Sequence, residues 1–119
     1  MGSAFEETCR AFLRRPKTLA FNPIRVGEWW DSSSENQVDV VALGEGGDVL
    51  VGECKWGAVD PEDVRKLRQR ADLVIAELPG TRHVHLALFS GRGEPSRALR
   101  AELAAAKADS FGPKELFSV

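Results

Sequence analysis

The chain has 119 residues, and its 16 Lys+Arg against 18 Asp+Glu give a formal net charge of −2. This length is typical of one domain, and 43% hydrophobic with 29% charged residues is the composition of a globular protein rather than a disordered one. A small domain that binds nucleic acid through its overall charge is usually strongly basic, so any contact with nucleic acid must depend on a local site.

Several classes of protein are excluded by their characteristic patterns. No stretch approaches the roughly 18 apolar residues of a membrane-spanning helix, and the first residues carry acids where a signal peptide needs a basic and then an apolar segment. There is no Cys/His set with zinc-site spacing and no phosphate-binding Gly-x-x-x-x-Gly-Lys-Ser/Thr loop. Two cysteines, Cys9 and Cys54, are too few for a disulfide scaffold. We therefore expect reduced thiols in a cytoplasmic protein with no membrane association.

The first predicted element is a helix over residues 3–15, which Pro16 terminates. At 100° per residue, Glu6 flanks the apolar stripe of this helix and Glu7 points nearly opposite. Glu6 is therefore expected to reach a protein-lined site and Glu7 to face water. The stripe itself consists of Phe5, Cys9, Phe12 and Leu13.

Three strands follow this helix. They are rich in apolar and β-branched residues, and a polar run and a glycine-rich run separate them, which predicts an antiparallel meander. The predicted strands cover residues 24–30, 37–43 and 49–56, joined by 31–36 and 44–48.

The second half of the chain alternates helices and strands. A helix begins at Asp60-Pro61 and stops at Pro79-Gly80, since Asp is a favoured N-cap and Pro suits the first helical position. The remaining predicted elements are a strand over 83–90, a helix from Pro95 to about Asp109 and a short final strand within 115–119. The order α-βββ-α-β-α-(β) predicts one α/β domain over residues 1–119, with helices on both faces of a mixed sheet of four to five strands.

The hairpin between the second and third strands brings two acids together. If it closes symmetrically about Gly46, Leu43 lies opposite Val49. The same register places Asp39 opposite Glu53, with Cβ atoms about 4.5–5.5 Å apart. A slip by one residue would turn Asp39 to the other face of the sheet.

Two carboxylates this close repel each other unless a cation or a proton lies between them. Mg²⁺ or Mn²⁺ suits such a pair, because these ions prefer carboxylate oxygens and Mg²⁺ keeps several waters for a phosphate substrate. Lys55 leaves the strand on the same face as Glu53, since the two residues are two apart. It can orient or deprotonate a water and stabilise charge that develops on a phosphate.

This arrangement resembles a known family. Asp39, thirteen intervening residues and then Glu53-Cys54-Lys55 resemble the signature of the PD-(D/E)XK, or restriction-endonuclease-like, superfamily, although Val38 stands where the signature has proline. More narrowly, Gly27–Asp31, Val38–Leu43 and Gly52–Trp56 resemble a domain of unknown function at the C-terminus of archaeal-type DEXX-box ATPases. The resemblance covers about residues 3–90.

The resemblance implies a three-layer α/β/α fold and a Mg²⁺-dependent endonuclease that cleaves DNA. Asp39 and Glu53 would hold the metal, helped by Glu6 and by the backbone carbonyl of Cys54, and Lys55 would position the attacking water. It also implies that an ATPase domain precedes this one in a longer protein.

Other interpretations of the same residues stay open. Asp39 and Glu53 could be solvated acids of an ordinary hairpin, and Lys55 could be no more than their salt-bridge partner. The domain could also be a non-catalytic DNA-binding or regulatory domain of an ATPase, or a homodimeric interaction domain that uses its exposed strand edges.

Basic and aromatic residues are further candidates for contacts with nucleic acid. Arg65, Arg68, Arg92 and Arg97 could bind DNA phosphates, or could belong to the solvated faces of helices. The three tryptophans could stack on bases, although core packing is expected for at least two of them. They are Trp29, Trp30 and Trp56.

Overall fold

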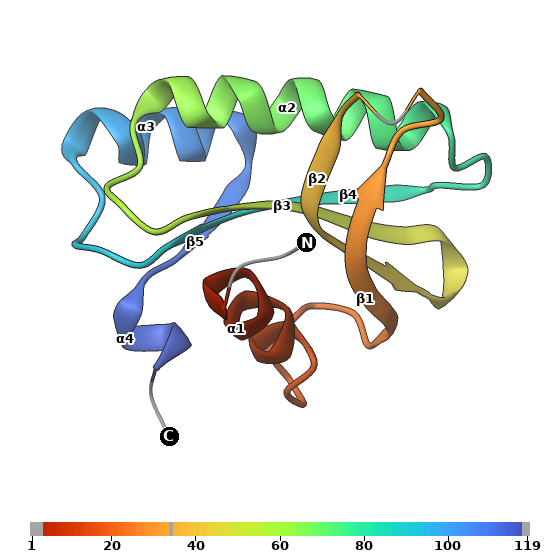
Figure 1. Cartoon of the computed structure of the whole chain (residues 1–119), viewed down its shortest axis with the longest axis horizontal. Helices are drawn as coiled ribbons and strands as arrows, with labels where there is room; N and C mark the ends of the chain where they lie inside the picture. Colours follow the sequence, from red (N-terminus) through yellow and green to blue (C-terminus); the bar gives the residue numbers. More distant parts are fainter. Residues whose placement is uncertain (1–3, 34, 118–119) are drawn as a thin grey trace.

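The computed structural model describes residues 4–33 and 35–117. One five-stranded sheet, in the order β1-β2-β3-β4-β5, carries helices on both faces (Figure 1). The elements in chain order are α1 (Ala4–Leu13), β1 (Pro23–Trp30), β2 (Gln37–Gly44), the 3₁₀ turn η1 (Glu45–Gly47), β3 (Asp48–Lys55), α2 (Pro61–Ala76), β4 (His83–Ser90), α3 (Arg97–Ala106), β5 (Ala108–Phe111) and α4 (Pro113–Leu116).

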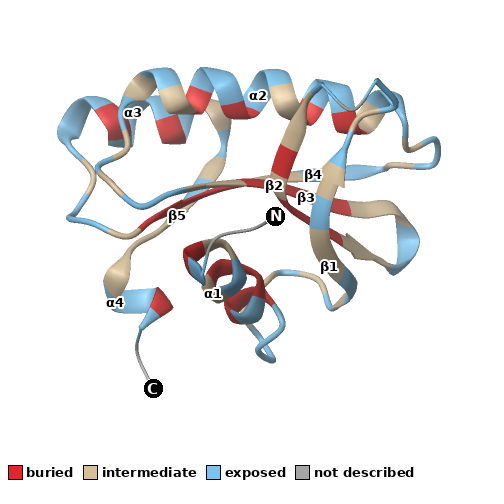
Figure 2. Cartoon of the chain, viewed as in Figure 1, coloured by how far each residue is buried: buried red, intermediate tan, exposed pale blue. Residues whose placement is uncertain are grey.

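The molecule has three layers, as the sequence predicts. Helices α2 and α3 cover one face of the sheet, while α1 and α4 lie on the other (Figure 1). Figure 2 shows that the buried residues of α1, α2 and α3 face the sheet. Two apolar cores result, one on each face, and strand alternation divides the residues of β2 and β3 between them. Val41 and Val51 belong to the α2 side, and Val40 and Leu50 to the α1 side.

The antiparallel meander and its register are confirmed. Strands β1, β2 and β3 pair antiparallel, and Leu43 lies opposite Val49. The turn between β2 and β3 requires glycine, because Gly46 and Gly47 have φ values of 78° and 88°, in the left-handed region that disfavours other residues. The pairing runs as far as Val40 opposite Gly52, so the next residues along are Asp39 and Glu53.

Helix α2 connects β3 to β4, which pairs parallel with β3. The helix begins with a capping box: the Asp60 carboxylate accepts from the Asp63 N–H at 3.2 Å, and the Asp63 carboxylate accepts from the Asp60 N–H at 2.9 Å. The predicted start at Asp60-Pro61 is therefore confirmed. No helix within the described part of the chain is long and apolar enough to cross a membrane.

The C-terminal elements differ from the prediction. The helix expected to reach about Asp109 ends at Ala106, and residues 108–111 form the fifth strand instead. The strand predicted within 115–119 is wrong over the part that the structure describes. Pro113 begins the short helix α4 there, and Leu116 of this helix is buried in the core on the α1 side of the sheet. Positions 118–119 lie outside the described residues.

Candidate functional site

Asp39 and Glu53 come together where β2 and β3 stop pairing. The Asp39 Oδ2 atom accepts a hydrogen bond from the Cys54 N–H at 3.0 Å, which ties the carboxylate of one strand to the backbone of the other. The Glu53 side chain is only 20% exposed. Its Oε1 atom is buried and has no hydrogen-bond partner in the described part of the chain. A buried carboxylate oxygen with no donor is costly, and such an atom needs a specific explanation.

The pKa of Glu53 reflects this environment. Burial is the largest cause, and together with contact with the adjacent Asp39 carboxyl and charge repulsion from it, burial raises the pKa of Glu53 to about 8. Glu6 contributes a smaller repulsion in the same direction, whereas Arg70 opposes the shift. At neutral pH the Glu53 carboxyl therefore keeps its proton, which is the behaviour expected of an acid close to another acid without a cation.

Arg70 of α2 is a neighbour of the pair that the sequence prediction missed. Its Nε atom lies 3.5 Å from Glu53 Oε1, and its guanidinium also donates to the Gln37 carbonyl. The helical spacing held a signal for this position, because Arg70 follows the buried Leu67 by three residues and precedes the buried Ala71 by one. Arg70 thus lies at the border of the buried stripe and reaches the sheet.

Lys55 lies beside the pair but binds a different acid. Its Nζ atom is 3.0 Å from Asp63 Oδ2, and this contact raises the pKa of Lys55 and keeps it cationic. A cavity of about 120 Å³ lies next to Glu53. The charged side chains that line it belong to Glu53, Lys55, Asp63, Lys66 and Arg70.

Glu6 and Cys54 complete the set of predicted metal-site residues. Glu6 lies on α1, as predicted, at a half-buried position, and its charge reaches Glu53. Both cysteines are free thiols, and contact with Cys9 together with burial raises the pKa of the Cys54 thiol. Within residues 4–33 and 35–117, no three side chains of His, Cys, Asp or Glu gather as a complete metal site.

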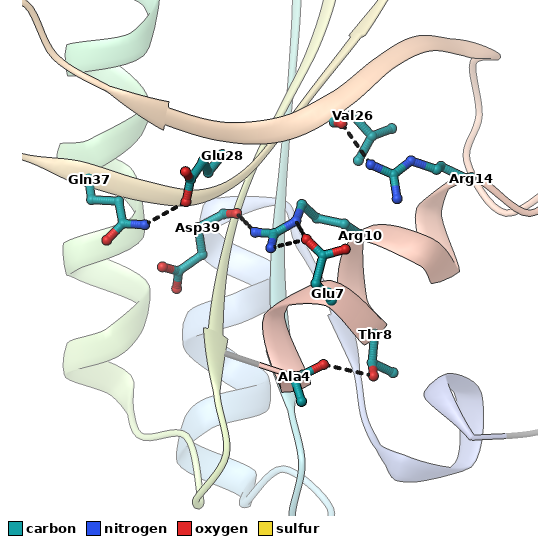
Figure 3. A network of polar contacts seen from close by, with 9 residues as sticks. All are labelled: Ala4, Glu7, Thr8, Arg10, Arg14, Val26, Glu28, Gln37 and Asp39. Carbon is teal, nitrogen blue, oxygen red and sulfur yellow. Dashed lines mark hydrogen bonds and ion pairs between the residues drawn. The ribbon is translucent and has the colours of Figure 1, made fainter. Parts of the chain in front are cut away.

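Arg10 supports the site from the α1 side. The residue is only 4% exposed, and its Nη1 atom donates to the Asp39 carbonyl at 2.9 Å while its Nε donates to Glu7 at 3.0 Å. Figure 3 shows the guanidinium between these two partners, with the Asp39 carboxylate pointing away from it. Glu7 is largely exposed, as predicted, but it pairs with this buried cation. The sequence prediction did not single out Arg10.

The predicted DNA-contacting arginines lie on exposed positions of three segments. Arg65 and Arg68 are on α2, Arg92 follows β4, and Arg97 begins α3. Arg65 also pairs with Glu62 at 2.7 Å. Their role in nucleic-acid binding stays a prediction.

The residues present suit a divalent cation. The buried Glu53 Oε1 atom accepts no hydrogen bond within the described residues, and the Glu53 pKa stays raised beside Asp39 although Arg70 lies 3.5 Å away. These are features expected of an acid pair that a hard cation would stabilise. Among the described residues two side chains form the centre of this site, so further ligands such as backbone carbonyl groups and waters would have to complete it.

Comparison with known proteins places this geometry in context. A family model described as "Archaea bacterial proteins of unknown function", DUF234, matches residues 1–67. No curated protein matches the chain. Among solved structures, a repair endonuclease from Pyrococcus abyssi matches with a TM-score of 0.66 and 18% identity over 94% of this chain. The structure of a complex of EndoMS with dsDNA matches with a TM-score of 0.59 and 13% identity, again over 94%.

These likenesses confirm the restriction-endonuclease-like fold that the sequence predicts. The chain spans about half the length of the two solved proteins, 47% and 46% respectively. The likeness therefore extends across nearly the whole of this domain and across one part of each larger protein.

Proposed function

The chain belongs to the DUF234 family of archaeal and bacterial proteins of unknown function, and from this premise we propose that it is a metal-dependent nuclease domain that hydrolyses DNA phosphodiesters. The observation that carries the proposal is the half-buried Asp39–Glu53 pair, in which Glu53 Oε1 accepts no hydrogen bond from the described residues and the Glu53 pKa is raised although Arg70 lies 3.5 Å away. Strongly perturbed acids beside a charged cavity are typical of functional sites.

Each residue of the site has a role in this proposal. Asp39 and Glu53 would hold Mg²⁺ or Mn²⁺, with Glu6 and the Cys54 carbonyl as further ligands. The bound ion would supply a Lewis acid that lowers the pKa of a water and offsets charge on the scissile phosphate. Arg10 and the Cys54 N–H keep Asp39 in position.

The cations of the cavity would receive the phosphate. Lys55 is 44% exposed, and an exposed ion pair such as Lys55–Asp63 contributes little stability, so the ammonium group can leave Asp63 for an anionic substrate. Lys55 would then orient the attacking water and stabilise the charge that develops on the phosphate. Lys66 and Arg70, on the same cavity, add positive charge on the α2 side.

DNA is the proposed substrate, and the wider context supports this choice. The description of one solved neighbour names a complex with dsDNA and that of another names a repair endonuclease. Because this domain spans about half of those proteins, we propose that a further domain contributes to affinity, and an ATPase domain is the candidate that the sequence resemblance names. A homodimer through the edge strands is a second way to enlarge the DNA-binding surface.

Two observations favour an alternative, a non-catalytic DNA-binding or regulatory domain of an ATPase. Lys55 is engaged by Asp63, and no three ligating side chains converge in the residues that the structure describes. A domain that has lost catalysis would keep the acid pair protonated and would bind no metal.

Titration calorimetry with Mg²⁺ and Mn²⁺, followed by a nuclease assay on linear, supercoiled, branched and single-stranded DNA, tests the proposal. We expect metal binding and cleavage by the wild type, no metal binding by Asp39→Asn, and metal binding without cleavage by Lys55→Ala. Asp72→Asn, which changes an exposed acid of α2, is the control and should behave as the wild type. Absence of metal binding, or full cleavage by Lys55→Ala, would contradict the catalytic assignment.

A further inference from the structure

Trp56 presents an exposed indole ring beside the proposed site. It directly follows Lys55, the last residue of β3, and 64% of its surface is exposed. By contrast, Trp29 packs against the core on the α2 side. Core packing was expected for at least two of the three tryptophans, but Trp30 is also 45% exposed. A large exposed aromatic surface next to a site is a common sign of a binding partner.

The exposed ring is nevertheless held in place. The Phe5 ring meets it edge-on, with centroids 5.1 Å apart and planes at 76°. Gly91 is the second residue that packs against the ring, because a Cβ atom added at that position would lie 2.5 Å from Trp56 Cε3. The Gly91 N–H also donates to the Lys55 carbonyl at 3.0 Å, which fixes the backbone before the ring. A ring ordered before binding loses little conformational entropy when a ligand arrives.

The ring lies at the end of β3 that carries the acids of the site, on the α1 side of the sheet. Trp56 is three residues beyond Glu53 in the chain, and the charge of Glu6, at the start of α1, reaches Glu53. Phe5, which supports the ring, directly precedes Glu6 on α1. A DNA strand whose phosphate reached the Asp39–Glu53 pair would therefore enter at the end of the sheet where the ring is exposed, and the base of a neighbouring nucleotide is the group that would meet the ring.

We propose that Trp56, supported by Phe5 and Gly91, is a stacking platform for an unpaired DNA base next to the cleaved phosphate. The inference rests on the proposed function in taking DNA as the ligand, and it deepens that function by naming the substrate class. In a duplex, both faces of each base are covered by its neighbours, so a tryptophan ring stacks only on a base that is terminal, unpaired or turned out of the helix. The preferred substrate is therefore DNA with single-stranded character.

Stacking also suits a domain with little positive charge. With a formal net charge of −2, the chain gains little affinity from its overall field. Base–aromatic stacking is independent of sequence and adds affinity that does not come from the phosphates. The contribution of Trp56 should accordingly persist at salt concentrations that suppress phosphate contacts.

Binding measurements without divalent metal test the platform separately from cleavage. The ligands are an oligothymidylate of about 12 nucleotides and an abasic oligomer of the same length and charge. We expect Trp56→Ala to weaken binding of the oligothymidylate about tenfold, equal to about 1.4 kcal/mol, and to leave binding of the abasic oligomer unchanged. Trp56→Phe, which keeps a ring, should restore most of the loss.

Trp30 provides the matched control, because it is an exposed tryptophan of the edge strand β1. The oligothymidylate should quench indole fluorescence in the wild type and in Trp30→Phe, but much less in Trp56→Phe. Equal affinities of wild type and Trp56→Ala for oligothymidylate, or an equal loss on the abasic oligomer, would overturn the platform. If Trp56→Ala loses binding to both oligomers, thermal unfolding shows whether the variant is still folded. If it is unfolded, the fluorescence comparison of the two phenylalanine variants decides. Because no metal is present, neither result depends on whether the domain cleaves DNA.

Discussion

Glu53 is the residue whose chemistry depends most on its neighbours. Two residues away, Lys55 reaches solvent and Asp63, whereas Glu53 is half-buried between Asp39 and Arg70. The arginine at 3.5 Å does not offset the combined effects of burial and of Asp39, so the pKa stays raised. In the proposed function this carboxyl exchanges its proton for a cation, so its protonation state can be used to test the site.

The first prediction concerns the pH dependence of stability without metal. Glu53 titrates near pH 8 when folded, against 4.5 for the ordinary carboxyl. Between these values the folded protein keeps a proton that the unfolded chain has released, so the free energy of unfolding falls as pH rises, by up to about 1.4 kcal/mol per pH unit. Urea denaturation across this range measures the slope, and Glu53→Gln should lack this part of it.

The same proton links pH to metal binding. Since a divalent ion binds the ionised carboxyl, its affinity should rise by up to about tenfold per pH unit toward pH 8 and then level off. Calorimetry in buffers of different ionisation enthalpy counts the released proton. If stability instead depends on pH with the same slope in the wild type and in Glu53→Gln, Glu53 ionises normally and the first prediction is wrong.

At the scale of elements, α1 is joined to β2 by a buried arginine. Burial by itself lowers the pKa of Arg10, but Glu7, and then Glu6 and Glu28, outweigh it and raise the value, so the guanidinium remains charged. It therefore acts as a fixed donor to the Asp39 carbonyl through the layer between helix and sheet. The helix that carries Glu6 is in this way connected directly to the strand that carries Asp39.

The second prediction is that Arg10→Met lowers the free energy of unfolding by about 1–3 kcal/mol, because the partly buried Asp39 carbonyl loses its donor. Arg14→Met, directly after the same helix, is the matched control. Its side chain donates to the Val26 carbonyl, but it does so at the surface, and the expected loss is within about 0.5 kcal/mol. Chemical denaturation of both variants measures the difference, and equal losses would show that Arg10 does not connect the two elements. The metal affinity of Arg10→Met should fall as well.

On the scale of the whole molecule, the two ends of the parallel strands have different surroundings. The ends of β3 and β4 at Lys55 and Ser90 adjoin the acid pair and the cavity, whereas their beginnings at Asp48 and His83 lie at the far end of the sheet. The pairing of β2 with β3 ends at Val40 and Gly52, so the strands are no longer hydrogen-bonded in register at Asp39 and Glu53. Function is expected at this end alone.

The third prediction follows from this polarity and from the low net charge. DNA binding should be weak and salt-sensitive, and Arg68→Ala on α2 should reduce the slope of log affinity against log salt by about 1, the contribution of one phosphate. Arg82→Ala, an exposed change at the far end of the sheet, should leave the slope unchanged. Equal effects of the two substitutions would mean that binding follows net charge rather than one end of the molecule.

The amino-acid sequence by itself determined the features that depend on neighbours in the chain. Alternation along β2 and β3 and the glycines of the turn specify the hairpin register, and this register brings Asp39 to Glu53. The cap of α2 and the apolar stripe of α1 are local in the same way. The order of helices and strands before residue 97 can therefore be predicted from the sequence alone.

Only the tertiary structure decided the contacts that cross between layers. Arg10 and Arg70 are ordinary helical arginines until packing places one under Asp39 and the other beside Glu53, and the platform at Trp56 exists because Phe5 and Gly91 close against it. The C-terminal helix at Pro113 formed where a strand was predicted because Leu116 had a place in the core. Local pattern specifies backbone geometry, but burial and the pKa of Glu53 depend on atoms distant in sequence, which periodicity does not encode.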